Sequence, residues 1–464
     1  NELKGKVNYS VNGNIAILEV DNPPVNPLSS GVRAGLSEYI AKANNDESIK
    51  GIILTGAGRS FIAGADISEF GQKPDGPDLH TALKEIEFSK KPVLAAINGT
   101  ALGGGLETAL VCNYRMGTNK AIVGLPEVNL GLLPGAGGTQ RLPRLIGPSQ
   151  ALKMMIAGTP MSAKKALQQG VIDAISENSL MDDAIAFLQE KIGLDLNEHP
   201  KVRDKNEKVL EARGDDNVLS EAKALAAKTR RGQFAPGQII ACVEAAINED
   251  DFDIGMKKES EYFLECLINP QREAMIHIFF GERAASKISD IPKETPLLPI
   301  NSAGIVGSGT MGGGIAMNFA NAGIPVLVLD QDEKNLERGM GVIEKNYQMM
   351  VDRGRMTQEQ KDMVLGLITP TLSYEDLSDV DIAVEAVYEN LELKQEIFKS
   401  LDTVTKDHAI LASNTSGLDI DAIASSTKRP GKVVGTHFFS PANIMRLLEV
   451  VRGKDSSDET MATV

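Results

Sequence analysis

Glycine-rich turns beside glutamates are the first residues in this sequence that suit chemistry. In the segment NGTALGGGLETALVCN, residues Gly103 to Gly105 lead into a helical pattern that carries Glu107 in its first turn. Glycines let the backbone approach a ligand closely, and amides at a helix start point toward negative charge. The segment therefore suits an oxyanion site, although for this segment taken alone we favour a tight packed turn with Glu107 complementing the helix dipole.

A second glutamate lies further along, in LPEVNLGLLPGAGGTQRL. Glu127 stands between apolar neighbours, before another glycine-rich loop and a helix that we expect to begin near Gly138. Apolar surroundings raise the proton affinity of a carboxylate and suit it to proton exchange near neutral pH, but a structural hydrogen bond is the alternative. Upstream, RSFIAGADISEF places Gly64 and Ala65 in a turn before a helix, which is also typical of an ordinary strand-to-helix connection.

A third pattern predicts dinucleotide binding. Gly307, Gly309 and Gly312 stand in the order G-x-G-x-x-G between an expected strand and an expected helix. Asp330 follows at the end of the next strand, where an acid binds ribose hydroxyls and repels a 2′-phosphate. The context favours NAD over NADP, and a glycine turn without a nucleotide is the alternative.

Composition limits the other possibilities. The 464 residues predict two or three cores, and 42% hydrophobic with 24% charged residues is typical of globular proteins. A net charge of -15 disfavours a general nucleic-acid or anionic-membrane surface. The three scattered cysteines predict neither a disulfide framework nor a metal site, and with no membrane-length apolar run or signal-peptide core we expect an intracellular protein without stable membrane insertion.

The elements that position these residues follow an α/β rhythm. Strands are expected at 15–20, 50–54, 93–97, 121–123, 303–306 and 326–329, and helices at 31–43 and 180–192. Residues 193 to 290 lack β-rich runs, and helices are expected at 219–227, 238–247 and 272–287. Prolines at 292, 296 and 299 predict an extended linker. We therefore expect an α/β protein with a first domain over residues 1–192, a helical connector and linker over 193–295, and a Rossmann-type, doubly wound NAD-binding domain over 296–464.

Taken together, the glycine and glutamate segments resemble the crotonase (enoyl-CoA hydratase/isomerase) superfamily. The resemblance includes FIAGADI, NGTALGGGLETAL, LPEVNLGLLPGAGGTQRLPRLIG and MSAKKALQQGVID. It implies a spiral of ββα turns, a coenzyme A thioester as ligand, and an oxyanion hole from the amides of Ala65 and Gly104. It further implies that Glu107 activates a water, that Glu127 protonates the substrate, and that the Gly135 amide orients the water or the carbonyl. Because both acids are present, hydration is favoured, with isomerase activity through Glu127 as a further hypothesis.

The last third of the chain resembles the 3-hydroxyacyl-CoA dehydrogenases, through DIAVEAVYENLELKQEIF, ILASNTSGLDI and GTHFFSPANIMRLLEVV. The resemblance implies that His437 takes a proton from the 3-hydroxyl, that Glu449 orients the imidazole, and that Ser416 touches the substrate hydroxyl or the nicotinamide side. Without it, His437 is a packed histidine and Glu449 a surface acid. The implied cofactor-binding residues, with the three glycines above, are Met311, Asp330, Val387, Tyr388, Glu389, Lys394 and Ser440. Ser440 stands where many relatives have Asn, which puts its cofactor contact in doubt.

The union of the two halves resembles the multifunctional enzymes of fatty-acid β-oxidation, in the style of the peroxisomal type 1 enzymes. The expected ligands are acyl-CoA substrates and NAD, without metal or nucleic acid, and a thiolase partner or self-association stays open. The location would be cytoplasmic in a bacterium and peroxisomal in a eukaryote. Because the helical domains that follow in the family are absent from the sequence, we expect hydratase activity and NAD affinity with poor dehydrogenase turnover. A non-catalytic CoA- and NAD-binding scaffold, and an isomerase with an incomplete dehydrogenase, are the alternatives.

Overall fold

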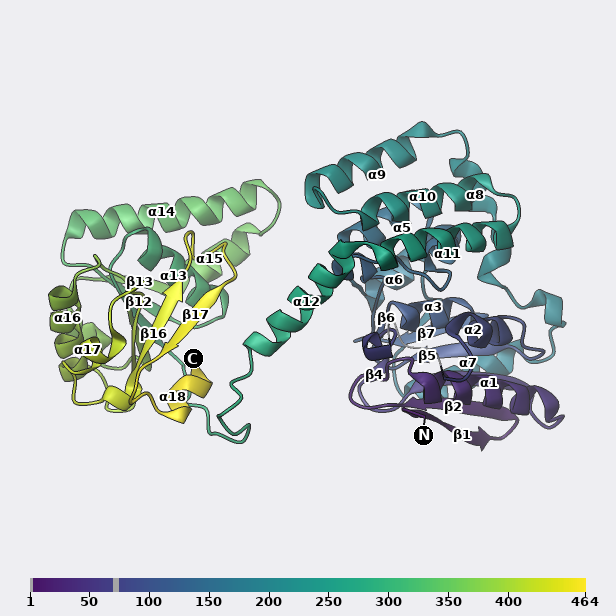
Figure 1. Cartoon of the computed structure of the whole chain (residues 1–464), viewed down its shortest axis with the longest axis horizontal. Helices are drawn as coiled ribbons and strands as arrows, with labels where there is room; N and C mark the ends of the chain where they lie inside the picture. Colours follow the sequence, from purple (N-terminus) through teal and green to yellow (C-terminus); the bar gives the residue numbers. More distant parts are fainter. Residues whose placement is uncertain (1–2, 70–74) are drawn as a thin grey trace. The chain divides into compact units, whose positions relative to one another are not determined.

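The computed structural model describes residues 3–69 and 75–464 and divides into two units, residues 1–285 and 286–464 (Figure 1). Residues 70–74, part of the segment Phe70–Asp78 on which we expect the depth of an acyl pocket to depend, lie outside the described residues. Each unit has its own buried apolar clusters, as expected for a chain of this length.

Apolar runs of the first unit form a six-stranded sheet. Its order is β1-β2-β3-β5-β7-β10; β1 and β2 form an antiparallel hairpin, and the other neighbours are parallel. All residues of β3 and β5 are buried, which explains their uninterrupted apolar sequences. The strands are Lys6–Asn12 (β1), Ile15–Asp21 (β2), Gly51–Gly56 (β3), Val93–Ile97 (β5), Tyr114–Thr118 (β7) and Ala174–Ser176 (β10).

A second sheet of short strands completes the expected crotonase spiral. Consecutive strands alternate between the sheets, since β3, β5 and β7 pair in the first sheet while β4, β6 and β8 pair in the second. Each turn of the chain thus contributes one strand to each sheet, which confirms the predicted repetition. The strands are Ser60–Ile62 (β4), Thr100–Leu102 (β6), Ile122–Gly124 (β8) and Met161–Ser162 (β9).

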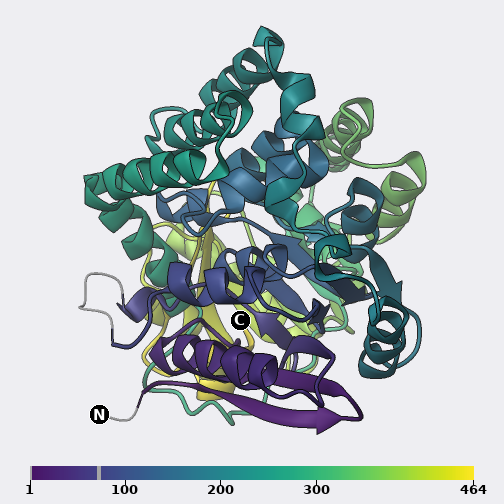
Figure 2. The same ribbon diagram turned by 90° about the vertical axis from the view of Figure 1, so that its right-hand side faces the viewer.

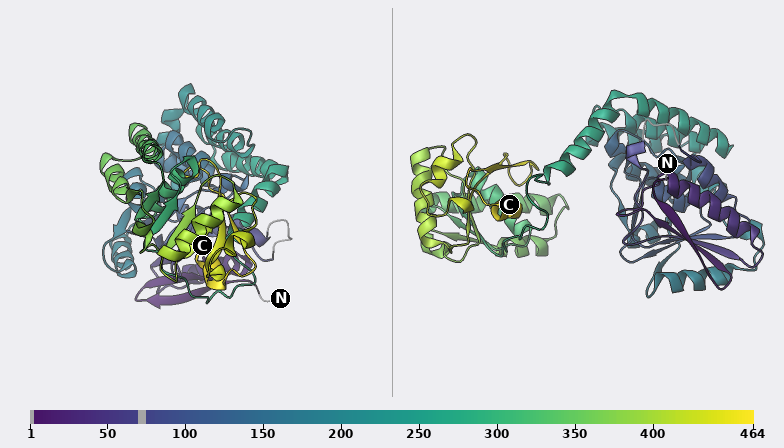
Figure 3. Two further views of the ribbon diagram at one scale, coloured as in Figure 1. Left: turned by 90° about the vertical axis from the view of Figure 1, so that its left-hand side faces the viewer. Right: turned by 60° about the horizontal axis from the view of Figure 1, so that its bottom comes forward.

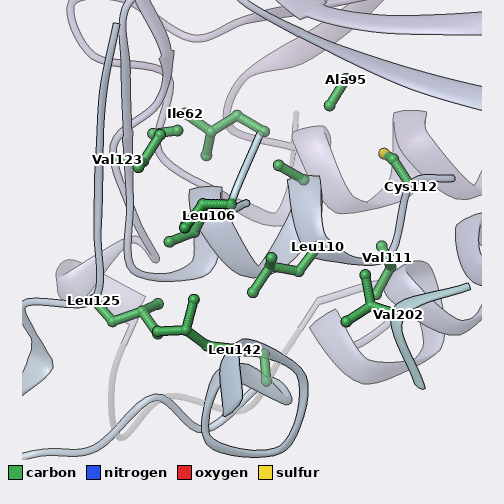
Figure 4. Packing of buried hydrophobic residues seen from close by; sticks show 14 of the residues in the cluster. Ile62, Ala95, Leu106, Leu110, Val111, Cys112, Val123, Leu125, Leu142 and Val202 are labelled. Carbon is green, nitrogen blue, oxygen red and sulfur yellow. The ribbon is translucent and has the colours of Figure 1, made fainter. Parts of the chain in front are cut away.

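Helices of the first unit pack around this spiral, and their starts are set by capping side chains. Asp78 accepts a hydrogen bond from the Thr81 amide at the start of α2, and Ser179 accepts one from the Asp182 amide at the start of α7. Leu106 and Leu110 project from α3 into the apolar cluster drawn in Figure 4. The helices are Ser30–Asn45 (α1), Leu79–Glu87 (α2), Gly104–Leu110 (α3), Gly138–Ile146 (α4), Pro148–Ala157 (α5), Ala163–Gln169 (α6) and Leu180–Lys191 (α7).

The helices between residues 207 and 285 belong to the first unit; those up to residue 268 pack on its core, whereas the helix over residues 270–285 has no buried residue. Ile239 and Val243 of α10 are fully buried in the same apolar cluster as the strands, and α10 packs against α4 and α5. Figure 2 shows these teal helices stacked on one another. Helix α11 had no counterpart among the expected elements, and it contacts α4. The helices are Glu207–Ala212 (α8), Asp216–Thr229 (α9), Ala235–Asn248 (α10), Phe252–Ile268 (α11) and Pro270–Ala285 (α12).

The second unit is a doubly wound α/β fold, as expected (Figure 3). Its strand order is β13-β12-β11-β14-β15-β16-β17, and only β17 is antiparallel to its neighbour. One apolar cluster joins one face of the sheet to α13 and α14, and another joins the opposite face to α16 and α17. The strands are Ala303–Val306 (β11), Val326–Leu329 (β12), Ile368–Thr371 (β13), Ile382–Glu385 (β14), Ile410–Ser413 (β15), Val433–Phe438 (β16) and Leu448–Arg452 (β17).

The helices of this unit begin mostly at polar caps, such as Asp332 before α14, which accepts from the amides of Lys334 and Asn335. They are Thr310–Asn321 (α13), Glu333–Asp352 (α14), Gln358–Gly366 (α15), Leu391–Val404 (α16), Ile420–Ala424 (α17) and Asp458–Thr463 (α18). Among the described residues, no helix has the length and apolar character that crossing a membrane requires.

Candidate active sites

Glu107 is held in the first turn of α3 by backbone amides. Its side chain is buried, and Oε1 accepts hydrogen bonds from the amides of Ala136 at 2.9 Å and Gly138 at 2.8 Å. Burial raises the pKa of Glu107, whereas the amides of Gly138 and Ala136 oppose that rise. These two donors stabilise the ionised form, which suits Glu107 to act as a base.

Glu127 has a contrasting environment. It begins the 3₁₀ helix η2 (Glu127–Leu130), and its Oε2 is buried without a hydrogen-bond partner among the described residues. Burial, and then the charge of Glu107, raise the pKa of Glu127 well above the ordinary value. The carboxyl therefore holds its proton more tightly than an exposed glutamate, which suits it to act as an acid.

The glycines explain how the two carboxyls come together. Glu127 Oε1 lies 2.8 Å from the position that a Cβ would occupy on Gly103, so this residue must be glycine for the carboxyl to lie there. Gly103 has φ +55° and caps α3, whose first turn carries Glu107. The influence of the Glu107 charge on the pKa of Glu127 reflects the same proximity. The structure thus brings the two sequence-predicted acids to one place.

The two expected oxyanion amides are neighbours. Ala65 N lies 3.6 Å from the position that a Cβ would occupy on Gly104. Gly104 is the first residue of α3, where an amide has no intrahelical acceptor, and Ala65 follows Gly64, whose φ is +103°. Two amides at such turns can stabilise negative charge on a carbonyl oxygen. Gly135 lies in the loop before α4, next to the Ala136 amide that binds Glu107.

A third buried carboxylate was missed by the sequence reasoning. Glu259 of α11 is fully buried, and its Oε1 accepts a hydrogen bond from the Gly137 amide at 2.7 Å. Burial and the charge of Glu107 raise the pKa of Glu259 to about 8. A signal was present in the sequence, since Gly255, Glu259 and Phe263 recur at one helical spacing, but no helix was expected there.

In the second unit the three glycines form an open turn. Gly307 has φ +108°, and a Cβ on Gly312 would lie 1.8 Å from Gly307 O, so both positions require glycine. A Cβ on Gly309 would meet no heavy atom within 4 Å, and Gly309 caps α13, whose second residue is Met311. The exposed backbone at a helix start is where a pyrophosphate binds in a dinucleotide fold.

Asp330 is tied to the same turn. Its Oδ2 accepts hydrogen bonds from the Ser308 amide at 3.0 Å and from the Ser308 hydroxyl at 2.6 Å. Burial alone would raise the pKa of Asp330, but hydrogen bonds from Ser308 and Asp332 lower it overall. An ionised acid at this strand end suits the ribose hydroxyls of NAD, so the residues present fit that cofactor.

A second turn, which carries the cofactor-binding candidates at 387–389, is held in place by the buried Glu385. The buried Glu385 pairs with Lys394 at 2.6 Å and accepts hydrogen bonds from the Ser413 hydroxyl at 2.6 Å and the Val387 amide at 2.9 Å. Tyr388 is 87% exposed. The Lys394 side chain, by contrast, is buried, so it supports this turn instead of standing at its surface.

Glu389 and Ser416 meet at the carboxyl ends of β14 and β15. Glu389 accepts hydrogen bonds from the Ser416 amide at 3.2 Å and from the Thr415 hydroxyl. Burial raises the pKa of Glu389, but the bonds from Thr415 and Ser416 lower it overall. The structure therefore groups these two sequence-predicted residues.

His437 and Glu449 form a hydrogen-bonded pair. They are directly opposed on β16 and β17, and His437 Nδ1 lies 2.8 Å from Glu449 Oε2. The next amide along β16, that of Phe438, donates to Asn414 Oδ1 at 2.9 Å, which joins this strand end to the loop that carries Ser416. Ser440 is exposed just beyond β16. The pair has the geometry of a histidine base oriented by a carboxylate.

Comparisons with known proteins agree with this division of the chain. Residues 10–224 match the family described as enoyl-CoA hydratase/isomerase, and residues 302–464 match the 3-hydroxyacyl-CoA dehydrogenase, NAD binding domain. The chain is 40% identical to the peroxisomal bifunctional enzymes of Cavia porcellus and Homo sapiens, over 97% of this chain and 62% of each relative. It is 37% identical to the fatty acid oxidation complex subunit alpha of Psychrobacter cryohalolentis, over 96% of this chain and 63% of the relative. The chain thus spans less than two thirds of the length of these curated relatives.

Proposed function

We propose that this chain performs two consecutive reactions of fatty-acid β-oxidation. Residues 10–224 belong to the enoyl-CoA hydratase/isomerase family, and residues 302–464 belong to the NAD-binding domain family of 3-hydroxyacyl-CoA dehydrogenases. The first hydrates a 2-trans-enoyl-CoA to a 3-hydroxyacyl-CoA. The second oxidises that product to a 3-ketoacyl-CoA. The order is chemically coherent, since the product of the first site is the substrate of the second.

The unequal environment of the two glutamates is the observation that carries the hydratase. Glu107, stabilised as an anion by two amides, takes a proton from water while the water oxygen bonds to C3. Glu127, whose Oε2 has no partner among the described residues, delivers its proton to C2. A proton then passes from Glu107 to Glu127 through solvent, which restores both groups and leaves one water added to the double bond.

The oxyanion amides act on the other end of the substrate. As C3 is attacked, negative charge moves onto the thioester oxygen, where the amides of Ala65 and Gly104 donate hydrogen bonds. Losing one such donor typically lowers the rate about a hundredfold to a thousandfold. The Gly135 amide would orient the water or the carbonyl. Glu127 could also move a proton between C2 and C4, which would add isomerase activity in the same pocket.

The second site supports dehydrogenation by a histidine base. Bound NAD would supply the acceptor for the hydride that leaves C3 of the substrate. The glycine turn would hold the pyrophosphate of NAD, and Asp330 would bind its ribose hydroxyls. Residues 387–389 would contact the rest of the cofactor. His437 Nδ1 donates to Glu449, which leaves Nε2 to take the proton of the 3-hydroxyl. Ser416 would contact the same hydroxyl.

Three details of the proposal concern the chain as a whole. We assign the hydratase to residues 1–192 and the dehydrogenase part to 296–464; the connector over 193–295 contributes helices that pack on the hydratase up to residue 285. The named relatives include peroxisomal enzymes and a bacterial complex subunit, so the location would be peroxisomal in a eukaryote and cytoplasmic in a bacterium. A thiolase partner or self-association is proposed on the same basis, and co-purification with a thiolase would test it.

Substrate consumption tests the proposal against its alternatives. Crotonyl-CoA, a 2-trans-enoyl-CoA, and a 3-enoyl-CoA are each given to the chain while the enoyl-thioester absorbance is followed. Loss of that absorbance with crotonyl-CoA, with 3-hydroxybutyryl-CoA as product, is the expected result. Reaction of the 3-enoyl-CoA alone would identify an isomerase, and reaction of neither would identify a scaffold. Single-turnover NADH formation from 3-hydroxybutyryl-CoA tests the second site.

A further inference from the structure

Four consecutive amides before and at the start of α4 are shared between two carboxylates. The amides of Ala136 and Gly138 donate to Glu107, whereas those of Gly137 and Thr139 donate to Glu259, at 2.7 and 3.2 Å. Successive amides thus point alternately to two different helices, α3 and α11. These four amides belong to one short stretch of backbone, so the carboxylate that binds two of them also limits the positions of the two that bind Glu107.

One face of α11 is fitted to this loop. The Phe263 ring lies 2.5 Å from the position of a Cβ on Gly135, and Met256 Sδ lies 3.3 Å from that position on Gly137. Residues 256, 259 and 263 lie on the same side of a helix, so this face contacts the loop, while Gly255 lies next to Gln140 of α4. The bond between the Thr139 hydroxyl and Glu259 adds a side-chain tie to the backbone ties.

We propose that Glu259 is a positioning residue for the hydratase, which holds the amides of Gly137 and Thr139 and thereby aims those of Ala136 and Gly138 at Glu107. The inference rests on the proposed hydratase function. It gives the helices after residue 193 a part in the first site, since α11 supplies a buried carboxyl that accepts hydrogen bonds from the loop that orients the base.

Charge is a second link between Glu259 and the acids of the site. The groups that face it are Glu107 on α3, Glu127 on η2, Arg141 on α4 and Cys242 on α10. The charge of Glu259 contributes to raising the pKa of Glu127, after burial and Glu107. Above a pH of about 8, where Glu259 is ionised, removing its charge therefore lowers the pKa of Glu127, an effect that a side chain serving only to fill space would not have.

The test compares Glu259→Gln with Glu261→Gln, the same change at an exposed position of α11. For Glu259→Gln we expect kcat for crotonyl-CoA hydration to fall about tenfold to a hundredfold, with KM nearly unchanged, because the base is misaligned while the binding surface stays. The pH at which kcat falls because Glu127 loses its proton should also be lower in this variant. Glu261→Gln should match the wild type in both respects.

Amide hydrogen exchange gives a readout that is independent of turnover. In Glu259→Gln, the amides of Ala136 and Gly138 should exchange faster, although neither of them bonds to Glu259. Thr139→Val, which removes only the hydroxyl tie, should give a smaller change of the same kind and serves if Glu259→Gln does not fold.

The outcomes separate the inference from the function on which it rests. A folded Glu259→Gln with wild-type kcat, pH profile and exchange would overturn the positioning role while leaving the hydratase intact. Wild-type chain that hydrates no enoyl-CoA would overturn the function and, with it, the catalytic meaning of Glu259. Faster exchange at Ala136 and Gly138 would then still show that Glu259 holds the loop.

Discussion

Glu127 Oε1 lies 2.8 Å from the position that a Cβ would occupy on Gly103, the residue that also caps the helix of Glu107. One glycine therefore serves both acids. Its φ of +55° lets the chain turn into α3, and the absence of a side chain leaves room for the Glu127 carboxyl. This relationship explains why a glycine-rich turn and a distant glutamate belong to one site.

The Gly103→Ala variant should lose hydratase activity. The added methyl would displace the Glu127 carboxyl, so we expect a fall of about a hundredfold in kcat for crotonyl-CoA. Gly58→Ala is the matched control, because Gly58 also has positive φ but a Cβ there would meet nothing within 4 Å. Both variants should lose about 1–2 kcal/mol of stability through backbone strain. Equal activity in the two variants would contradict the steric explanation.

Stability of the first unit should fall as pH rises. The pKa values of Glu107, Glu127 and Glu259 are raised by burial, so the folded unit binds protons that the unfolded chain releases. The stabilisation from these protonated carboxyls is complete below the ordinary glutamate pKa of 4.5. It is lost as pH rises through the pKa of each group in the folded state, which is about 8 for Glu259. Denaturant midpoints measured across this window should decline, and Glu259→Gln should flatten the decline. A midpoint that rises across the window would exclude this linkage.

The buried pair of Glu385 and Lys394 should be important for the stability of the second unit. Both side chains are almost fully buried and lie 2.6 Å apart, so Lys394→Met leaves an unpaired buried carboxylate. We expect a loss of about 3–5 kcal/mol in unfolding free energy. The double variant with Glu385→Gln should recover part of it, because the unpaired charge is gone. If the double variant is as unstable as the single one, charge burial is not the cause.

Much of the fold followed from the sequence, and the exceptions have physical causes. Strands such as Val93–Ile97 and Ala303–Val306 have the predicted bounds, because fully buried parallel strands are uninterrupted apolar runs. Strands β4 and β6 of the second sheet are too short to show a pattern of period two, whereas β8 lies close to the strand expected at residues 121–123. Helix α11 is charged along much of its length, so its buried face was not apparent.

The candidate sites divide in the same way. Glu107 and Glu127 stood out because glycine-rich turns flank them, and the structure places them together. Glu259 did not, because the amides that bind its carboxyl lie in a loop more than a hundred residues earlier in the chain. Lys394 illustrates the reverse, since its position in a motif did not reveal that its ammonium is buried against Glu385.

Asp330 should determine the preference for NAD. Asp330→Ala removes an ionised acceptor, so we expect NAD affinity to fall about tenfold or more and discrimination against NADP to weaken. Titration calorimetry with both nucleotides measures this directly. Glu333→Gln, an exposed change three residues further along, is the control and should leave both affinities unchanged. Unaltered NAD affinity in Asp330→Ala would rule out the ribose contact.

The rate of crotonyl-CoA hydration by the Glu127→Gln variant tests the acid and base assignment most directly. Glutamine keeps the shape of the side chain but has no carboxyl proton to deliver to C2. We predict a fall in kcat of about a hundredfold to ten-thousandfold, with the variant folded and still able to bind the thioester. Hydration within about threefold of the wild-type rate would contradict the account.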